Sequence, residues 1–108
     1  MKLRLLLVCM ATIVFSFCTD EEKPALPKDT MVNILVDVHV AEAALIGLAE
    51  QHKDSLAEVY YQQIYEIHGV SEESFSREMD YIKRHPEYMD DLYTLVLEEL
   101  AKREAALQ

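Results

Sequence analysis

The 108-residue chain contains only two glycines, Gly47 and Gly69. Phosphate-binding loops need several closely spaced glycines, so the sequence excludes this class of nucleotide site. It also lacks the CxxC and HExxH metal motifs and the nucleophile elbow of serine hydrolases. We therefore expect a protein that is not an enzyme, with no catalytic residue, no metal site and no cofactor.

Basic residues are scarce: 10 lysines and arginines face 20 aspartates and glutamates, for a formal charge of −10. Lys2 and Arg4 lie at the very start, and without them the charge is −12. Nucleic acids and anionic lipids are bound by basic patches, so we expect no nucleic-acid partner. An anionic membrane surface should repel such a domain.

Long apolar runs are also absent. The longest, Leu5 to Phe17, covers 13 residues and follows Lys2 and Arg4. A membrane-spanning helix needs about 20 apolar residues, so this run fits the core of a signal peptide better. Residues 1–17 are therefore expected to be a leader that lies outside the folded domain.

The leader ends at Cys18, and Phe15-Ser16-Phe17-Cys18 resembles a bacterial lipobox, in which the cysteine is acylated. Phe17 occupies a place usually given to a small residue, so two alternatives stay open: ordinary cleavage around Ser16 and Cys18, or a leader that stays attached. Acylation of Cys18 would leave the mature chain without a thiol, because Cys9 lies in the leader. The expected partner is then a membrane, through the lipid anchor.

Residues 18–28 are expected to form a tether between the lipidated cysteine and the domain. Pro24 and Pro27 stiffen it, and an extended tether reaches about 30 Å. Its acidic start, Asp20 to Glu22, resembles the surface-export signal of Bacteroidota lipoproteins, whereas a plain solvated linker is the alternative. The expected location is the outer membrane, facing either the cell surface or the periplasm.

Four helices are expected in residues 29–108, so the fold class is all-α, a small bundle of four short helices. The first runs from about Lys28 to Leu48, capped by Asp29 or Thr30. After a polar break at 51–54, Ser55 and Glu58 form a capping box for a helix ending at His68, where Gly69 supplies the left-handed terminus. Ser71 caps the third helix, with Val70 and Phe75 as a hydrophobic staple. His85-Pro86 separates it from the last, which ends near Ala105.

The helical period of 3.6 residues predicts which faces are buried. The expected core positions are Leu56, Val59, Tyr60, Ile64 and Ile67 in the second helix, Phe75, Met79 and Ile82 in the third, and Met89, Leu92, Leu95, Val96 and Leu100 in the fourth.

Several segments resemble the domain-of-unknown-function family 4296, a set of short Bacteroidota lipoproteins. They are Met31 to Ala43, Tyr60-Tyr61 with Ile64-Tyr65, Phe75, Tyr81, His85-Pro86-Glu87 and Leu92-Tyr93. The resemblance spans most of the mature chain and implies an organism group and an envelope location. It implies no activity, because the family has none established.

Glu42 is the most unusual residue of the first helix, since it falls in the middle of an apolar arc that includes Ile34 and Val38. A buried carboxylate needs a partner, and His39, three residues earlier, is within reach. The pair His39 and Glu42 is either a polar functional site or a buried structural pair completed by a tyrosine or a basic residue. Asp37 points about 160° away from His39 and cannot join them.

Two further stripes are candidate contact surfaces. Val32, Val36 and Val40 make the first helix apolar nearly all round, which fits either a central helix or a partner-binding one. Tyr61, Tyr65 and His68 form a ridge on the second helix, and tyrosine is common at interfaces. The expected partner is an envelope protein or a glycan, unless neighbouring helices cover these stripes.

These features together favour a lipid-anchored envelope lipoprotein that acts as a non-catalytic binding or accessory module. A periplasmic chaperone-like or assembly factor is the first alternative. A small enzyme or metal-binding module centred on His39 and Glu42 is the second.

Overall fold

The computed structural model of the chain describes residues 22–108, and residues 1–21, including the leader and Cys18, lie outside this part. The described part contains four helices and no strands, so the predicted all-α fold is confirmed. The helices are α2 (Lys28–Leu45), α3 (Glu50–His68), α4 (Glu72–Arg84) and α5 (Pro86–Ala106).

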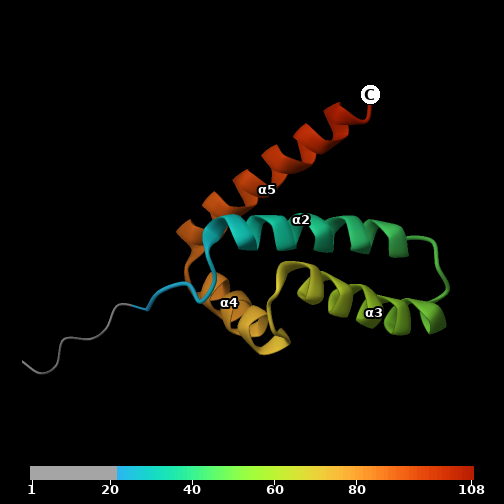
Figure 1. The fold of residues 1–108 in the computed structure, drawn as a ribbon, viewed down its shortest axis with the longest axis horizontal. Coiled ribbons are helices and arrows are strands. Elements are labelled where there is room, and N and C mark those ends of the chain that lie inside the picture. Colours follow the sequence, from blue (N-terminus) through green and yellow to red (C-terminus); the bar gives the residue numbers. More distant parts are fainter. Residues whose placement is uncertain (1–21) are drawn as a thin grey trace, which may run out of the picture.

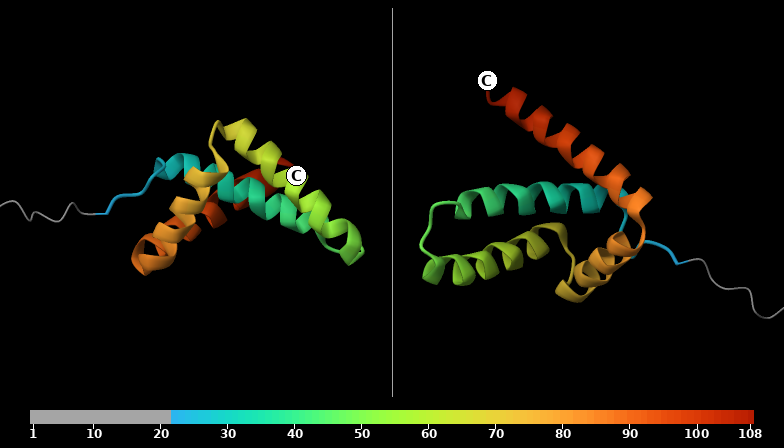
Figure 2. Two further views of the ribbon diagram at one scale, coloured as in Figure 1. Left: turned by 90° about the horizontal axis from the view of Figure 1, so that it is seen from below. Right: turned by 180° about the vertical axis from the view of Figure 1, so that it is seen from behind.

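Helix α2 is the central element. Helix α3 runs antiparallel beside it, and α5 packs on its other side before diverging from it (Figure 1). The short α4 joins α3 to α5 and packs mainly on the N-terminal half of α2, with Phe75 at its start also packing against Val38. Figure 2 shows that the C-terminal end of α5 projects away from the α2–α3 pair. Helix α3 therefore flanks the second half of α2, from about Asp37 onward, whereas α4 and α5 pack around its first half.

Helix α2 starts directly after Pro27, whose carbonyl accepts a hydrogen bond from the Met31 amide at 3.0 Å. No side chain caps this end, so the expected cap by Asp29 or Thr30 is wrong: both residues already belong to the helix. Helix α2 ends at Leu45, three residues before the predicted end, and Gly47 follows with a positive φ of 88°.

Helix α3 begins at Glu50, so the expected polar break at 51–54 is helical and the capping box is wrong. The Ser55 hydroxyl instead donates to the His52 carbonyl at 3.4 Å. A serine inside a helix bonds to a carbonyl of the preceding turn, which leaves its capping function unused. The other end is as predicted: α3 ends at His68, and Gly69 is left-handed with φ 63°.

The boundaries of α4 and α5 follow their local signals. The Ser71 hydroxyl accepts a hydrogen bond from the Ser74 amide at 3.1 Å, which confirms the predicted cap. Val70 and Phe75 both pack on the cluster formed by Ile34, Val38 and Ile64. His85 interrupts the helical path, and Pro86 occupies the first turn of α5, where its missing amide hydrogen costs nothing.

The core is built mainly from α2, and its largest cluster joins α2 to α4 and α5. That cluster contains Met31, Val32, Leu35, Val36, Ile82, Leu92 and Val96. Two predicted core residues of α3 are wrong, since Val59 is 49% and Ile67 is 73% exposed. Only one side of α3 meets α2, and α4 and α5 do not extend far enough to cover the rest.

Candidate functional site

The expected polar pair lies at the surface. His39 and Glu42 are both exposed, and no hydrogen bond joins them within residues 22–108. Glu42 Oε1 instead accepts a hydrogen bond from the Tyr61 hydroxyl of α3 at 3.2 Å. The expectation of a buried pair is wrong, because both side chains lie at the open rim of the space between the helices and stay in contact with solvent.

His39, Glu42, Tyr61 and Tyr93 surround a small hollow of ≈ 180 Å³. Its remaining lining is apolar: Leu35, Val38, Phe75, Met79 and Val96. Burial, and then the negative charge of Glu42 and the hydrogen bond to it, raise the pKa of Tyr61. The hydroxyl therefore stays protonated and acts as a donor to the carboxylate.

The tyrosine ridge of α3 is mostly covered. Tyr65 is only 8% exposed and Tyr61 is half-buried. Phe75 of α4 packs against both, with ring centroids 5.3 Å from Tyr65 and 6.5 Å from Tyr61. The alternative that a neighbouring helix covers this ridge therefore fits Tyr65 and in part Tyr61, since their rings belong to an internal cluster between α3 and α4.

The valine stripe of α2 is divided. Val32 and Val36 are buried against α5 and are not available to a partner. Val40, one turn further along, is 54% exposed because α5 has diverged from α2 at that point. The interpretation of α2 as the central helix is thus correct for its first half, and only Val40 remains a candidate contact residue.

A groove of ≈ 290 Å³ opens beside Val40, between α2 and α3. It is lined by Asp37, Val40, Ala41 and Ala44 of α2 and by Tyr60, Gln63, Ile64 and Ile67 of α3. Val40 and Ile67 are both more than half exposed, on the two helices that form the groove. This site, termed the α2–α3 groove below, combines small residues on one wall with larger apolar residues on the other.

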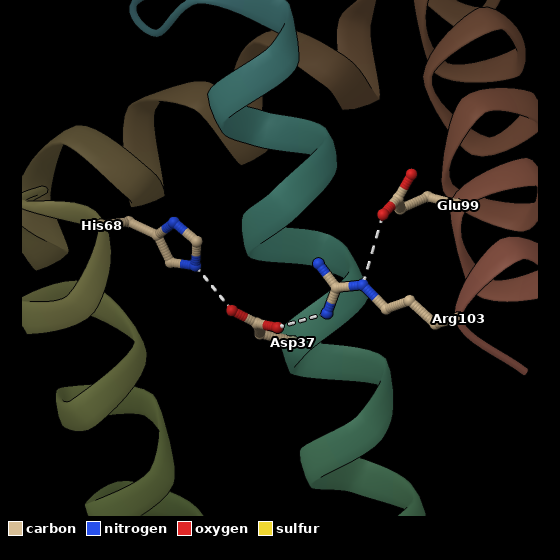
Figure 3. A network of polar contacts seen from close by, with 4 residues as sticks. All are labelled: Asp37, His68, Glu99 and Arg103. Carbon is tan, nitrogen blue, oxygen red and sulfur yellow. Dashed lines mark hydrogen bonds and ion pairs between the residues drawn. The ribbon is translucent and has the colours of Figure 1, made fainter. Parts of the chain in front are cut away.

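Asp37 closes one end of the groove and links three helices (Figure 3). His68 Nε2 of α3 lies 2.6 Å from Asp37 Oδ2, and Arg103 Nη1 of α5 donates to Asp37 Oδ1 at 3.1 Å. Arg103 Nε also donates to Glu99 at 3.3 Å. Hydrogen bonds to Asp37 and Glu99 raise the pKa of Arg103. Asp37 therefore fixes α3 and α5 relative to α2.

Sequence reasoning missed this network, because Asp37 was considered only as a partner for His39. A signal was nevertheless present. Asp37 is a single carboxylate in a strongly apolar stretch, and His68 and Arg103 each lie in the last turn of their own helices, where cations are favoured.

Glu78 is a second polar site that sequence reasoning missed. It is completely buried on α4, and its Oε2 accepts hydrogen bonds from the amides of Ala25 at 2.6 Å and Leu26 at 3.1 Å. The Tyr88 hydroxyl donates to Oε1 at 3.4 Å. Glu78 lies on the same helix face as Phe75 and Ile82, which are both predicted to be buried. The helical period therefore also predicts a buried position for Glu78.

The described part contains no group of three histidine, cysteine, aspartate or glutamate side chains arranged to hold a metal ion. Within residues 22–108, no helix combines the length and the apolar composition needed to span a membrane. The sequence-predicted Cys18 lies outside the described residues.

Comparison with known proteins gives one match. The profile of the family described as Domain of unknown function (DUF4296) matches residues 23–106, which include all four helices. Neither the curated proteins nor the solved structures contain a match. The matched range covers most of the chain, as the resemblance in the sequence indicated, and the chain therefore belongs to the DUF4296 family.

Proposed function

We propose that this protein is a non-catalytic lipoprotein of the bacterial outer membrane that binds another envelope protein through the α2–α3 groove. The observation that carries the proposal is the exposure of Val40 (54%) and Ile67 (73%) on the two helices that form the groove. Exposed apolar residues gathered around a concave surface are typical of protein-binding sites.

The lining of the groove favours a protein over a glycan. Its contact residues are mainly aliphatic, with Tyr60 as the only aromatic member. Glycans are usually held by stacking on aromatic rings and by many hydrogen bonds, whereas aliphatic walls suit the apolar side chains of a helix or an extended peptide. Asp37 at the end of the groove can accept a hydrogen bond from the partner's backbone.

The anchor is supported by the leader and by the position of Cys18 after it. Growth with a fatty-acid probe should label the wild-type protein but not a Cys18→Ala variant, and only the wild type should sediment with outer membranes. Equal labelling and equal fractionation of both proteins would contradict the anchor.

Binding is tested by crosslinking in intact cells. Val40→Asn and Ile67→Asn should each abolish a specific crosslinked protein, because an amide placed in the groove loses apolar contact and must be desolvated. Val59→Asn is the matched control, since Val59 is 49% exposed on α3 but does not line the groove. A crosslink that all three variants retain would refute the groove as the binding site.

A further inference from the structure

We propose that residues 22–27 are bound to the corner between α4 and α5, so that this corner faces the membrane and the α2–α3 groove faces away from it. The inference rests on the proposed acylation of Cys18. The corner between α4 and α5 is then the surface of the domain that lies closest to the bilayer.

The carboxylate of Glu78 binds the backbone of residues 24–27. Pro24 and Pro27 have no amide hydrogen, so Ala25 and Leu26 carry the only two backbone donors of residues 24–27. Both donate to the same oxygen of Glu78, a side chain that is 0% exposed. Release of the segment would leave a buried carboxylate with Tyr88 as its remaining partner, which strongly favours the bound state.

Two further contacts hold the segment on either side of these amides. The Leu26 side chain packs against both hydrophobic clusters of the core. On the other side, Glu22 forms an ion pair with Arg84 at the end of α4. The domain thus begins before residue 29, where the sequence analysis placed its start, and the end of the expected tether is part of the fold.

The bound segment shortens the free part of the tether. Cys18 and Glu22 are four residues apart, so they can be separated by at most about 14 Å. The expected free tether reaching to Lys28 spans about 30 Å. Acylation of Cys18 would therefore keep the α4–α5 corner close to the headgroups.

The groove lies toward the other end of the molecule. Helix α2 has 18 residues and is therefore about 27 Å long. Residues 22–27 join its N-terminal end, whereas the turn to α3 lies at its C-terminal end (Figure 1). Because the groove uses residues 37–44 of α2, it begins about 14 Å along the helix from the corner.

Charge supports the same orientation. The surface around the bound segment contains Lys23, Arg77 and Arg84 against Glu22 and Asp80. Positive and negative groups are thus nearly balanced around the bound segment, although the whole chain carries −10. An anionic headgroup layer therefore repels the remainder of the domain more strongly than the corner.

The test uses the acylated protein in nanodiscs of phosphatidylethanolamine and phosphatidylglycerol that contain a lipid with a gadolinium-chelate headgroup. A single nitroxide is attached at Glu87→Cys, near the corner, or at Glu50→Cys, near the α2–α3 turn. The near label should show a relaxation enhancement several times that of the far label. Equal enhancement at both sites would overturn the proposed orientation.

Two variants separate the bound segment from the length of the tether. In Glu78→Ala the near-to-far ratio should fall toward one, and an unchanged ratio would overturn the role of Glu78. Eight Gly-Ser residues inserted after Thr19 leave the fold intact and should also reduce the near-label enhancement severalfold. An insertion without effect would overturn the short-tether explanation even if Glu78→Ala does not fold.

Hydrogen exchange of the Ala25 and Leu26 amides tests the docking independently of the lipid. Both should exchange at least tenfold more slowly than unprotected amides, and unprotected exchange would overturn the inference. Mass spectrometry of the same sample for acyl chains on Cys18 tests the proposed function separately. Protected amides without acyl chains would refute the anchor, and with it the membrane orientation, but not the docking.

Discussion

The Tyr88 hydroxyl lies against the buried carboxylate of Glu78 at the corner between α4 and α5. Burial raises the pKa of Tyr88 to about 12, and the negative charge of Glu78 and the hydrogen bond to it act in the same direction. Ionisation would place two negative charges together, so the neutral hydroxyl is the form that the fold stabilises.

This pKa predicts how stability depends on pH. The folded state holds the Tyr88 proton more tightly than the unfolded chain, whose tyrosines have a pKa of about 10. The resulting stabilisation is complete below about pH 10 and is lost as the pH rises through about 12. The urea midpoint of the wild type should therefore fall between about pH 9 and about pH 11, and the fall should be smaller in Tyr88→Phe.

The control for this titration is Tyr93→Phe, because Tyr93 is 45% exposed on the same helix. It should show the same decrease in midpoint as the wild type. In a pH titration followed by tyrosinate absorbance, the transition at the highest pH should be missing in Tyr88→Phe and present in Tyr93→Phe. An identical midpoint decrease in Tyr88→Phe and Tyr93→Phe would contradict the assigned pKa.

At the scale of the helices, the divergence of α5 from α2 controls what is exposed. Leu92 and Val96 pack in the core, but Leu97 is 62% and Leu107 is 90% exposed. Beyond the first half of α5, Leu100 packs against the main cluster and Arg103 bonds to Asp37 of α2. This part of α5 has few apolar contacts and should open locally before the rest of the domain.

We predict that Arg103→Ala accelerates amide exchange in residues 97–106 by about threefold to fivefold, with little change elsewhere. Arg103 is 45% exposed and Asp37 is 28% exposed, so solvent screening limits the loss of stability to about 0.5–1 kcal/mol. Exchange measured by mass spectrometry on the intact protein resolves this segment.

Arg77→Ala is the matched control, since Arg77 pairs with Glu73 within one helix and both side chains are more than half exposed. Its effect should be smaller and confined to α4. Acceleration spread evenly over all four helices in Arg103→Ala would show that the network supports the whole core and not the end of α5.

At the scale of the molecule, acidic residues outnumber basic residues two to one. The ion pairs formed within residues 22–108 are mostly exposed, as for Lys28 with Asp91, so they offset little of the general repulsion. Charge of one sign destabilises a compact state, and salt weakens this repulsion over distances of about 10 Å.

The urea midpoint should therefore rise when sodium chloride is increased from about 0.01 M to about 0.3 M. A variant with Glu58, Glu66 and Glu104 changed to glutamine should respond less, because these exposed residues contribute to the repulsion. A midpoint that falls with added salt would mean that ion pairs contribute more to stability than the repulsion removes.

Helix ends with strong local chemistry were predictable from the sequence. Gly69, Ser71 and His85-Pro86 act through backbone geometry within a few residues, and each ends or starts a helix as expected. The capping box at Ser55 failed because α3 continues through it from Glu50, so its hydroxyl bonds to the preceding turn. A local signal thus marks a helix boundary only where the chain on one side of it is not helical. At Ser55 the chain is helical on both sides.

Two glutamates mark the limit of sequence reasoning about sites. Glu42 and Glu78 both lie on apolar helix faces, yet Glu42 is exposed and Glu78 is fully buried. Periodicity is a property of one helix and is the same in both cases. Only the tertiary structure shows that Glu42 lies at the open rim of a hollow, whereas residues 24–27, α4 and α5 enclose Glu78.

The sequence by itself determined the helical class, the position of most helix ends and the membership of the family, because these depend on neighbouring residues and on overall pattern. The tertiary structure alone decided which apolar stripes are covered, which carboxylates find partners and where a groove opens. Burial is set by the lengths and crossing angles of helices that are distant in the sequence, and the pattern of one helix does not contain them.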